Sequence, residues 1–180
     1  MHFMFAWRRV SYPWRMSPNL TSLRRTELAA LIAEGMLITL ATGQSDQYPA
    51  VARGLAARLD ETTGDITFLL ARSTAWSLLA DLASGAALAA TLAHPRSHRA
   101  IQLKGRQAQE TLPEPTDTAL VMRQSENVRL ALAASGFDDT MLSALTAFDP
   151  DDLSAITLTV DTAYDQSPGL HAGRALELSA

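Results

Sequence analysis

The sequence predicts an α+β fold with a mainly antiparallel sheet, and three observations lead to that prediction. Short apolar, β-branched segments are joined by tight polar turns, as in antiparallel hairpins. Segments with helical spacing do not alternate strictly with single strands. The chain has 180 residues, of which 47% are hydrophobic, enough for one core. We therefore expect one domain whose six strands close, or nearly close, into a small barrel with flanking helices, since closure leaves few exposed edges.

The first elements expected along the chain are a helix and three strands. Leu23, Leu28 and Leu31 recur at helical spacing and predict a helix over 22–34, with Gly35 as its stop. Apolar and alternating segments predict strands over 36–42, 49–59 and 66–70, with a hairpin turn over 60–64.

The second half of the chain is expected to add three strands and three helices. Ser73 is the expected N-cap of a helix over 73–84, and Trp76 is expected on the buried face of that helix. The further elements, in order, are strands over 86–93 and 98–109, helices over 115–135 and 138–147, a strand over 155–160 and an irregular tail from Asp161.

The first fifteen residues differ from the rest. They are aromatic and basic, and they follow neither a helical nor a strand period. Residues 1–15 are therefore either a mis-assigned start before Met16 or an arm that docks on a partner subunit. Residues 16–180 are expected to form the single domain.

Several kinds of protein are excluded by what the sequence lacks. There is no cysteine, which excludes disulfides, thiolate metal sites and a catalytic thiol. No two glycines stand two apart, so a dinucleotide-binding fingerprint is absent, and there is no G-x-S-x-G elbow. No apolar run approaches the roughly 18 residues of a membrane span. We expect a cytoplasmic protein without a membrane partner.

Two groups of polar residues are given structural interpretations. His94 and His98 stand four apart, but Pro95 argues against a helix between them, so they are expected in a loop and at a strand start without a metal. Asp149, Asp151 and Asp152 are interpreted as the solvated start of a helical turn.

Charge is distributed unevenly over the chain. Residues 53–106 carry seven basic and four acidic groups, whereas 107–180 carry three arginines and twelve acids. The net charge is −4. A basic segment inside an acidic protein favours a small anionic ligand such as a phosphate and argues against a nucleic-acid partner.

Two segments within the basic part could meet such an anion. Arg53 lies on an otherwise apolar face of its strand, where it needs either an internal carboxylate or an anionic ligand, and Gly54 beside it permits close approach to the backbone. Arg72, Ser73 and Thr74 open a helix, which is either a phosphate site or an ordinary cap.

A third candidate is a row of polar side chains on the strand over 98–109. Gln102, Lys104 and Arg106 share one face of that strand, opposite Ile101 and Leu103. The row is either the solvated face of a half-buried sheet or a surface that faces a ligand.

The order of these features resembles the pyridoxamine 5′-phosphate oxidase-like family of FMN-binding split barrels, from about Leu23 to Gln109. The family pattern Arg-x-x-x-x-Lys reads Arg53-Gly-Leu-Ala-Ala-Arg58 here. The pattern aromatic-x-x-x-x-Ser-Arg-Lys reads Phe68-Leu-Leu-Ala-Arg-Ser73-Thr74-Ala75. The pattern Arg-Gln-x-x-x-x-Gly reads Arg99-Ala100-Ile-Gln-Leu-Lys-Gly105.

The resemblance implies a homodimer that holds FMN in a cleft between its subunits. Arg53, Arg58, Ser73 and Thr74 would then lie at the phosphate end, with Arg99, Gln102 and Lys104 toward the ribityl chain or the ring. The full set of expected cofactor-binding residues is Arg53, Gly54, Leu55, Arg58, Phe68, Leu69, Arg72, Ser73, Thr74, Arg99, Gln102 and Lys104. Its activity would be that of a flavin-dependent oxidoreductase with a small-molecule substrate that the sequence does not name.

This chain also departs from the family pattern. Two cations of the phosphate clamp are Thr74 and Ala75 here, the family glutamine is Ala100, and the C-terminal Arg-Leu-His motif has no counterpart. Pyridoxamine phosphate oxidation itself is therefore not expected. The alternatives are a reductase that uses the deazaflavin F420, a stress protein that holds flavin or haem without turnover, and a cofactor-free structural dimer.

Overall fold

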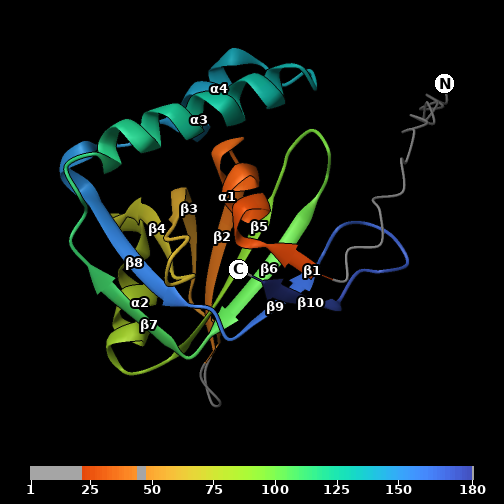
Figure 1. Ribbon diagram of the computed structural model, residues 1–180. Coiled ribbons are helices and arrows are strands. Elements are labelled where there is room, and N and C mark those ends of the chain that lie inside the picture. The colour runs from red at the N-terminus through yellow and green to blue at the C-terminus, as the bar shows by residue number, and fades with distance from the viewer. Residues whose placement is uncertain (1–21, 44–47, 180) are drawn as a thin grey trace, which may run out of the picture.

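The computed structural model describes residues 22–43 and 48–179 (Figure 1). Within these ranges the chain forms ten strands in one sheet, four α-helices and one 3₁₀ helix, so the predicted α+β class is confirmed. The expectation for residues 1–15 lies outside the described residues. None of the helices in the described ranges is long and apolar enough to cross a membrane.

The sheet is mainly antiparallel, as predicted, but it has more strands than six. The strand order is β1-β10-β9-β6-β5-β2-β3-β4-β8-β7, and within this order only β1 and β10 pair in parallel. The strands are β1 (Ser22–Arg24), β2 (Leu37–Gly43), β3 (Val51–Leu59), β4 (Ile66–Ala71), β5 (Ala87–Ala93), β6 (Ala100–Gly105), β7 (Gln107–Thr111), β8 (Leu153–Thr159), β9 (Thr162–Asp165) and β10 (Arg174–Ser179).

The helices pack on two parts of the sheet. The apolar residues of α1 (Arg25–Ala33) and α2 (Arg72–Ala83) enter the main core, where both helices pack against β3 and α2 also contacts β2, β4 and β7. The helices α3 (Asp117–Ala133) and α4 (Asp139–Thr146) lie together across one end of the sheet (Figure 1). A 3₁₀ turn, η1 (Pro150–Asp152), leads into β8.

The tail from Asp161 is not irregular, and that prediction is wrong. β9 pairs with the otherwise open edge of β6, and β10 pairs in turn with β9. Both strands are short, and β10 carries charged residues, so their local sequence gives little strand signal. Their structure comes from pairing with an edge that is distant in sequence.

The strand predicted over 98–109 is divided in two by a bend at Arg106. A Cβ atom on Gly105 would lie 2.1 Å from the carbonyl oxygen of Thr159. Only glycine therefore permits these two segments of the chain to approach each other this closely. The first half, β6, pairs with β5 and β9, whereas the second half, β7, pairs with β8. One run of chain therefore supplies both β6, the fourth strand in the order, and β7, the strand at its far end.

Two expectations for the helices are also wrong. The first helix begins at Arg25, because residues 22–24 pair with β10 as a strand. Trp76 is 72% exposed, and the buried face of α2 is formed by Ala75, Leu78, Leu79 and Leu82. The apolar stripe of α2 runs through Ala75, Leu78, Leu79 and Leu82 and leaves Trp76 beside it.

Candidate functional site

A β-bulge in β3 decides where the two arginines of the first motif point. Gly54 pairs with Leu70 and Ala56 with Leu69, so Leu55 is the extra residue on β3. Simple alternation would place Arg53 and Arg58 on opposite faces. The extra residue reverses the parity, which turns both arginines away from the main core that contains Ala52 and Ala57.

The bulge is held by a buried glutamine of α3. Gln124 Nε2 donates to the carbonyl oxygen of Ala57 at 2.8 Å, and Gln124 Oε1 accepts from the Ala57 amide at 3.0 Å. The side chain of Gln124 thus satisfies the backbone of Ala57 as a neighbouring strand would. Gly54 faces Ile38, whose Cγ2 would lie 2.6 Å from an added Cβ, so its small size serves the packing of β2 against β3.

Arg58 is neutralised within the chain. Its Nε donates to Asp117 Oδ1 at 3.1 Å, and its Nη2 lies 2.7 Å from Glu114 Oε1. The side chain of Asp117 is 1% exposed and that of Arg58 is 32% exposed. A buried carboxylate needs a partner of this kind, so the pair has a clear structural role.

The start of α2 is occupied by carboxylates. The backbone N–H of Ser73 donates to Asp152 Oδ1 at 2.9 Å, and the Ser73 hydroxyl donates to Asp152 Oδ2. The Arg72 guanidinium forms an ion pair with Glu110, which also accepts from the Ser154 hydroxyl at 2.6 Å. Ala71, and not Ser73, is the N-cap of α2. The expected helical start at Asp149, Asp151 and Asp152 is confirmed by η1, but Asp152 is only partly exposed and binds Ser73.

Thr74 does not point to the same acceptors. Its hydroxyl donates to the carbonyl oxygen of Ala71 at 3.2 Å, which closes the first turn of the helix. We call Arg58, Arg72 and Ser73, together with their carboxylate partners, the paired side; the name marks their shared pairing with carboxylates and not a single surface.

Arg53 is in a different environment. It forms no hydrogen bond or ion pair with any residue that the structure describes, and partial burial lowers the pKa of its guanidinium. Because Gly54 pairs with Leu70, Arg53 lies one residue further along, beside Ala71 and the start of α2. An arginine that is partly desolvated without a partner is a candidate for contact with an anion.

Arg53 stands at the margin of a face made largely of small side chains. The sheet register places Arg53, Thr39, Thr91, Gln102 and Tyr164 in one row across β3, β2, β5, β6 and β9. The outer face, as we name this surface, consists of Thr39, Ala41, Gly43, Val51, Arg53, Ala87, Ala89, Thr91, Gln102, Lys104, Thr162 and Tyr164.

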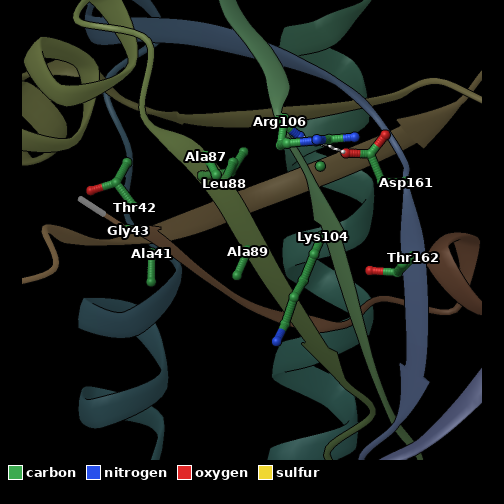
Figure 2. Close-up of a pocket in the computed structure, with 11 residues that line it drawn as sticks. Ala41, Thr42, Gly43, Ala87, Leu88, Ala89, Lys104, Arg106, Asp161 and Thr162 are labelled. Atoms are coloured by element: carbon green, nitrogen blue, oxygen red, sulfur yellow. Dashed lines mark hydrogen bonds and ion pairs between the residues drawn. The ribbon is translucent and has the colours of Figure 1, made fainter. Parts of the chain in front are cut away.

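A cavity of about 470 Å³ opens at one end of the outer face. Ala41, Ala87 and Ala89 form its floor, and Figure 2 shows Lys104 between Ala89 and Thr162. The Lys104 Nζ lies 5.0 Å from the centre of the Tyr164 ring, a cation–π contact.

Arg106 closes the far side of the cavity, where its Nε lies 3.4 Å from Asp161 Oδ2 (Figure 2). The alanine floor was missed by sequence reasoning. The small residues that alternate over 87–93 indicate a strand face without large side chains, but they do not indicate whether another element covers that face.

The structure does not bring all twelve predicted residues to the outer face. Arg53, Gln102 and Lys104 belong to it. The side chain of Phe68 is fully buried in the main core, and Leu55 and Leu69 lie in a second cluster beneath α3. Arg58, Arg72, Ser73 and Thr74 lie on the paired side or at its edge.

Arg99 and the two histidines occupy the turn between β5 and β6 or its margins. Arg99 is half-buried, and its Nε is buried without a hydrogen-bond partner among the described residues. The Nδ1 of His94 accepts from the Ser97 amide at 3.0 Å and so caps the turn. His98 has a positive φ of 57°. The described residues contain no cluster of histidine and carboxylate side chains that could hold a metal.

Comparisons with known proteins were made by sequence and by structure. No family model matches the chain, and neither does any characterised protein in a sequence search. Among solved structures, a putative pyridoxamine 5′-phosphate oxidase from Lactobacillus delbrueckii is 16% identical, with 82% of this chain and 97% of that chain covered and a TM-score of 0.47.

Two other similar structures have different names. General Stress Protein 26 from Bacillus anthracis is 13% identical, with 78% and 92% of the two chains covered and a TM-score of 0.46. HupZ from Group A Streptococcus is 14% identical, with 82% and 98% covered and a TM-score of 0.47. The structural neighbours are thus pyridoxamine 5′-phosphate oxidase-like and general stress protein 26 structures, the family that the sequence motifs resemble.

Proposed function

We propose that this chain is a flavin-binding protein of the split-barrel class, with FMN as its flavin and oxidoreductase chemistry as its activity. The observation that carries the proposal is Arg53, an exposed arginine that has no partner among the described residues and stands beside an open face of small side chains. A floor of small alanine side chains leaves room for a planar ring, and a nearby guanidinium can donate to polar atoms of the ligand.

The barrel itself is part of the proposal. In the strand order, β6 and β7 are separated by β5, β2, β3, β4 and β8. They are also successive segments of one run, divided only by Arg106. We infer that this bent run closes a six-stranded barrel, with β1, β9 and β10 as an extension beside β6. Closure would hold β2 and β5 in a fixed position beside β3 and so keep the outer face in one arrangement.

The residues of the outer face fit a flavin, whereas the residues at the start of α2 fit a phosphate poorly. Arg53, Gln102 and Lys104 would hold the flavin on the outer face, and the orphaned Nε of Arg99 offers a further donor. A bound flavin supplies hydride or electron transfer. Lys104 and Arg53 would add positive charge near it, whereas Asp152 and Glu110 occupy the donors at the start of α2.

We further propose that the protein is a homodimer in which the outer face is covered by the second copy. Ala41, Ala87 and Ala89 leave this part of the sheet with small apolar side chains and no covering helix among the described elements. A strand that is apolar on both faces, as β5 is, needs cover on both sides. The flavin and a small-molecule substrate would then share the interface.

A flavin titration of the purified chain tests the proposal. We expect the intrinsic fluorescence of FMN to be quenched on binding, with saturation at one flavin per chain. We also expect the Lys104→Ala variant to bind more weakly than the wild type. An absence of saturable binding of any flavin to the wild-type chain would contradict the proposed function.

A cofactor-free dimer is the second candidate, and a specific observation favours it. Three of the predicted phosphate-end donors, Arg58, Arg72 and Ser73, already bind carboxylates of the acidic C-terminal half. A chain that satisfies these donors internally has less need of a ligand to complete the fold. The same titration distinguishes the two candidates.

A further inference from the structure

We propose that Asp152 and Glu110 take the place of a phosphate at the start of α2, and that they make this protein indifferent to the phosphate of its flavin. The inference rests on the proposed function, because it concerns which flavin the site accepts. Its content is a specificity: riboflavin, which has no phosphate, should bind about as tightly as FMN.

The first step is that the two carboxylates use the donors that a phosphate would need. Asp152 accepts both the N–H and the hydroxyl of Ser73, and Glu110 accepts from Arg72 and Ser154. Two carboxylates carry together about the same charge as a phosphate near neutral pH. The start of α2 thus has its anions within its own chain.

The second step is that the sheet holds these carboxylates in place. Leu153 pairs with Ala71, so the preceding residue, Asp152, is held beside the first turn of α2. Glu110 pairs with Ile156 on β7 and β8. Neither carboxylate is on a long loop, so the backbone of each is fixed close to the donors that it meets.

The third step concerns the balance of charge. An arriving phosphate would gain Arg53, which has no partner among the described residues, but Asp152 and Glu110 outnumber Arg72 and leave the start of α2 with one net negative charge. Repulsion from the carboxylates opposes the attraction of the single arginine. The phosphate therefore adds little to binding, and the affinity comes from the ring and the ribityl chain.

Two conservative variants test the proposal. In Asp152→Asn and Glu110→Gln the remaining amide oxygen can still accept a hydrogen bond, while the negative charge is removed. The matched control combines Asp151→Asn and Glu61→Gln, two exposed residues whose side chains make no contact with α2. Both double variants change the net charge equally, so a difference between them reports position and not overall charge.

The measurement is the ratio of the dissociation constants of riboflavin and FMN, obtained by fluorescence titration at low salt. For the wild type and the control we expect the two constants to agree within about threefold, whereas the Asp152→Asn/Glu110→Gln variant should prefer FMN by about tenfold or more. A wild type that already prefers FMN tenfold would overturn the proposal. So would a double variant without any gain.

A second readout keeps this test separate from the proposed function. If neither flavin binds the wild type, the proposed function fails, and inorganic phosphate then serves as the probe. Phosphate should raise the melting temperature of the Asp152→Asn/Glu110→Gln variant above its value in chloride of equal ionic strength. It should not do so for the wild type or the control. No rise in the variant would overturn the inference, and the single variant Asp152→Asn replaces the double variant if that does not fold.

Discussion

The arginines of the paired side and of the outer face come from the same basic segment of the chain, but they differ in whether they pair with carboxylates. On the paired side, Arg58 and Arg72 each meet a carboxylate from residues 107–180. On the outer face, Arg53 meets none among the described residues, and Lys104 lies over an aromatic ring. The comparison teaches that a basic segment does not itself mark a ligand site. A more informative cation is one that has no partner among the described residues and lies beside an open face, as Arg53 does.

The largest expected effect tests how the bulge places Arg53 and Arg58 on one face. In Gln124→Leu the amide and carbonyl of Ala57 lose their partners in the buried interior. Each unsatisfied group is costly, so we expect the free energy of unfolding to fall by about 3 kcal/mol. Urea denaturation measures it. As the control, Gln109→Leu at an exposed position should change stability by less than about 0.5 kcal/mol.

A second prediction concerns the cover that we propose for the outer face. Ala89→Glu places a charge in the middle of the alanine floor, and we expect it to weaken a dimer by about 3 kcal/mol, because the charge would be buried unpaired at the interface. Light scattering should give twice the chain mass of 19.4 kDa for the wild type and a lower mass for the variant. Ala134→Glu, on an exposed helix end, should remain dimeric. A monomeric wild type would contradict the proposed dimer interface.

A third prediction compares an ion pair from each region. Asp117→Ala removes a buried carboxylate from the side chain of Arg58, so we expect a loss of about 2 kcal/mol of stability. Asp161→Ala removes the partner of Arg106, whose side chain is 87% exposed, and should cost less than about 1 kcal/mol. Thermal unfolding of both variants gives the comparison. Equal losses would show that the two regions do not differ as described.

The smallest expected effect is a pH dependence in the turn that joins β3 to β4. The backbone N–H groups of Thr62 and Thr63 donate to Asp60 and hold the pKa of its carboxyl below the ordinary value. A carboxyl of this kind stabilises the fold above its ordinary pKa, and that contribution is lost as the pH falls through the lower, folded pKa. The stability difference between the wild type and Asp60→Asn should therefore be present at neutral pH and vanish in acid. A difference that persists unchanged into acid would argue against the turn contacts.

Much of the fold could be predicted because its elements are marked locally. Each of these signals lies within a few residues of the element that it marks. Examples are the apolar stripe of α1, the capping carboxylate of Asp138 before α4, and the turn residues Asp60 and Gly64. By contrast, β9 and β10 exist because β6 offers an edge about 60 residues earlier in the chain, which no local pattern records.

The candidate site was predicted less well than the fold, for a physical reason. Alternation along β3 misplaced Arg58 relative to Arg53, because a one-residue bulge reverses every later side chain. The spacing of Arg72 and Ser73 indicated an anion at the start of α2, and an anion is there. This anion is the carboxylate of Asp152, which is 79 residues away in the sequence. Strand pairing brings it there, so the motif itself could not predict it.

The measurement that most directly tests the account is FMN binding to three arginine variants, since its central claim is that the unpaired arginine holds the ligand. We expect Arg53→Ala to weaken the binding of FMN and of riboflavin alike, by about tenfold, and Arg53→Lys to weaken both as well, because lysine lacks the forked set of donors of the guanidinium. Arg58→Ala, whose arginine already binds Asp117, should change the affinity by less than about threefold. Unchanged affinity in both Arg53 variants, or an equal loss in Arg58→Ala, would contradict the account.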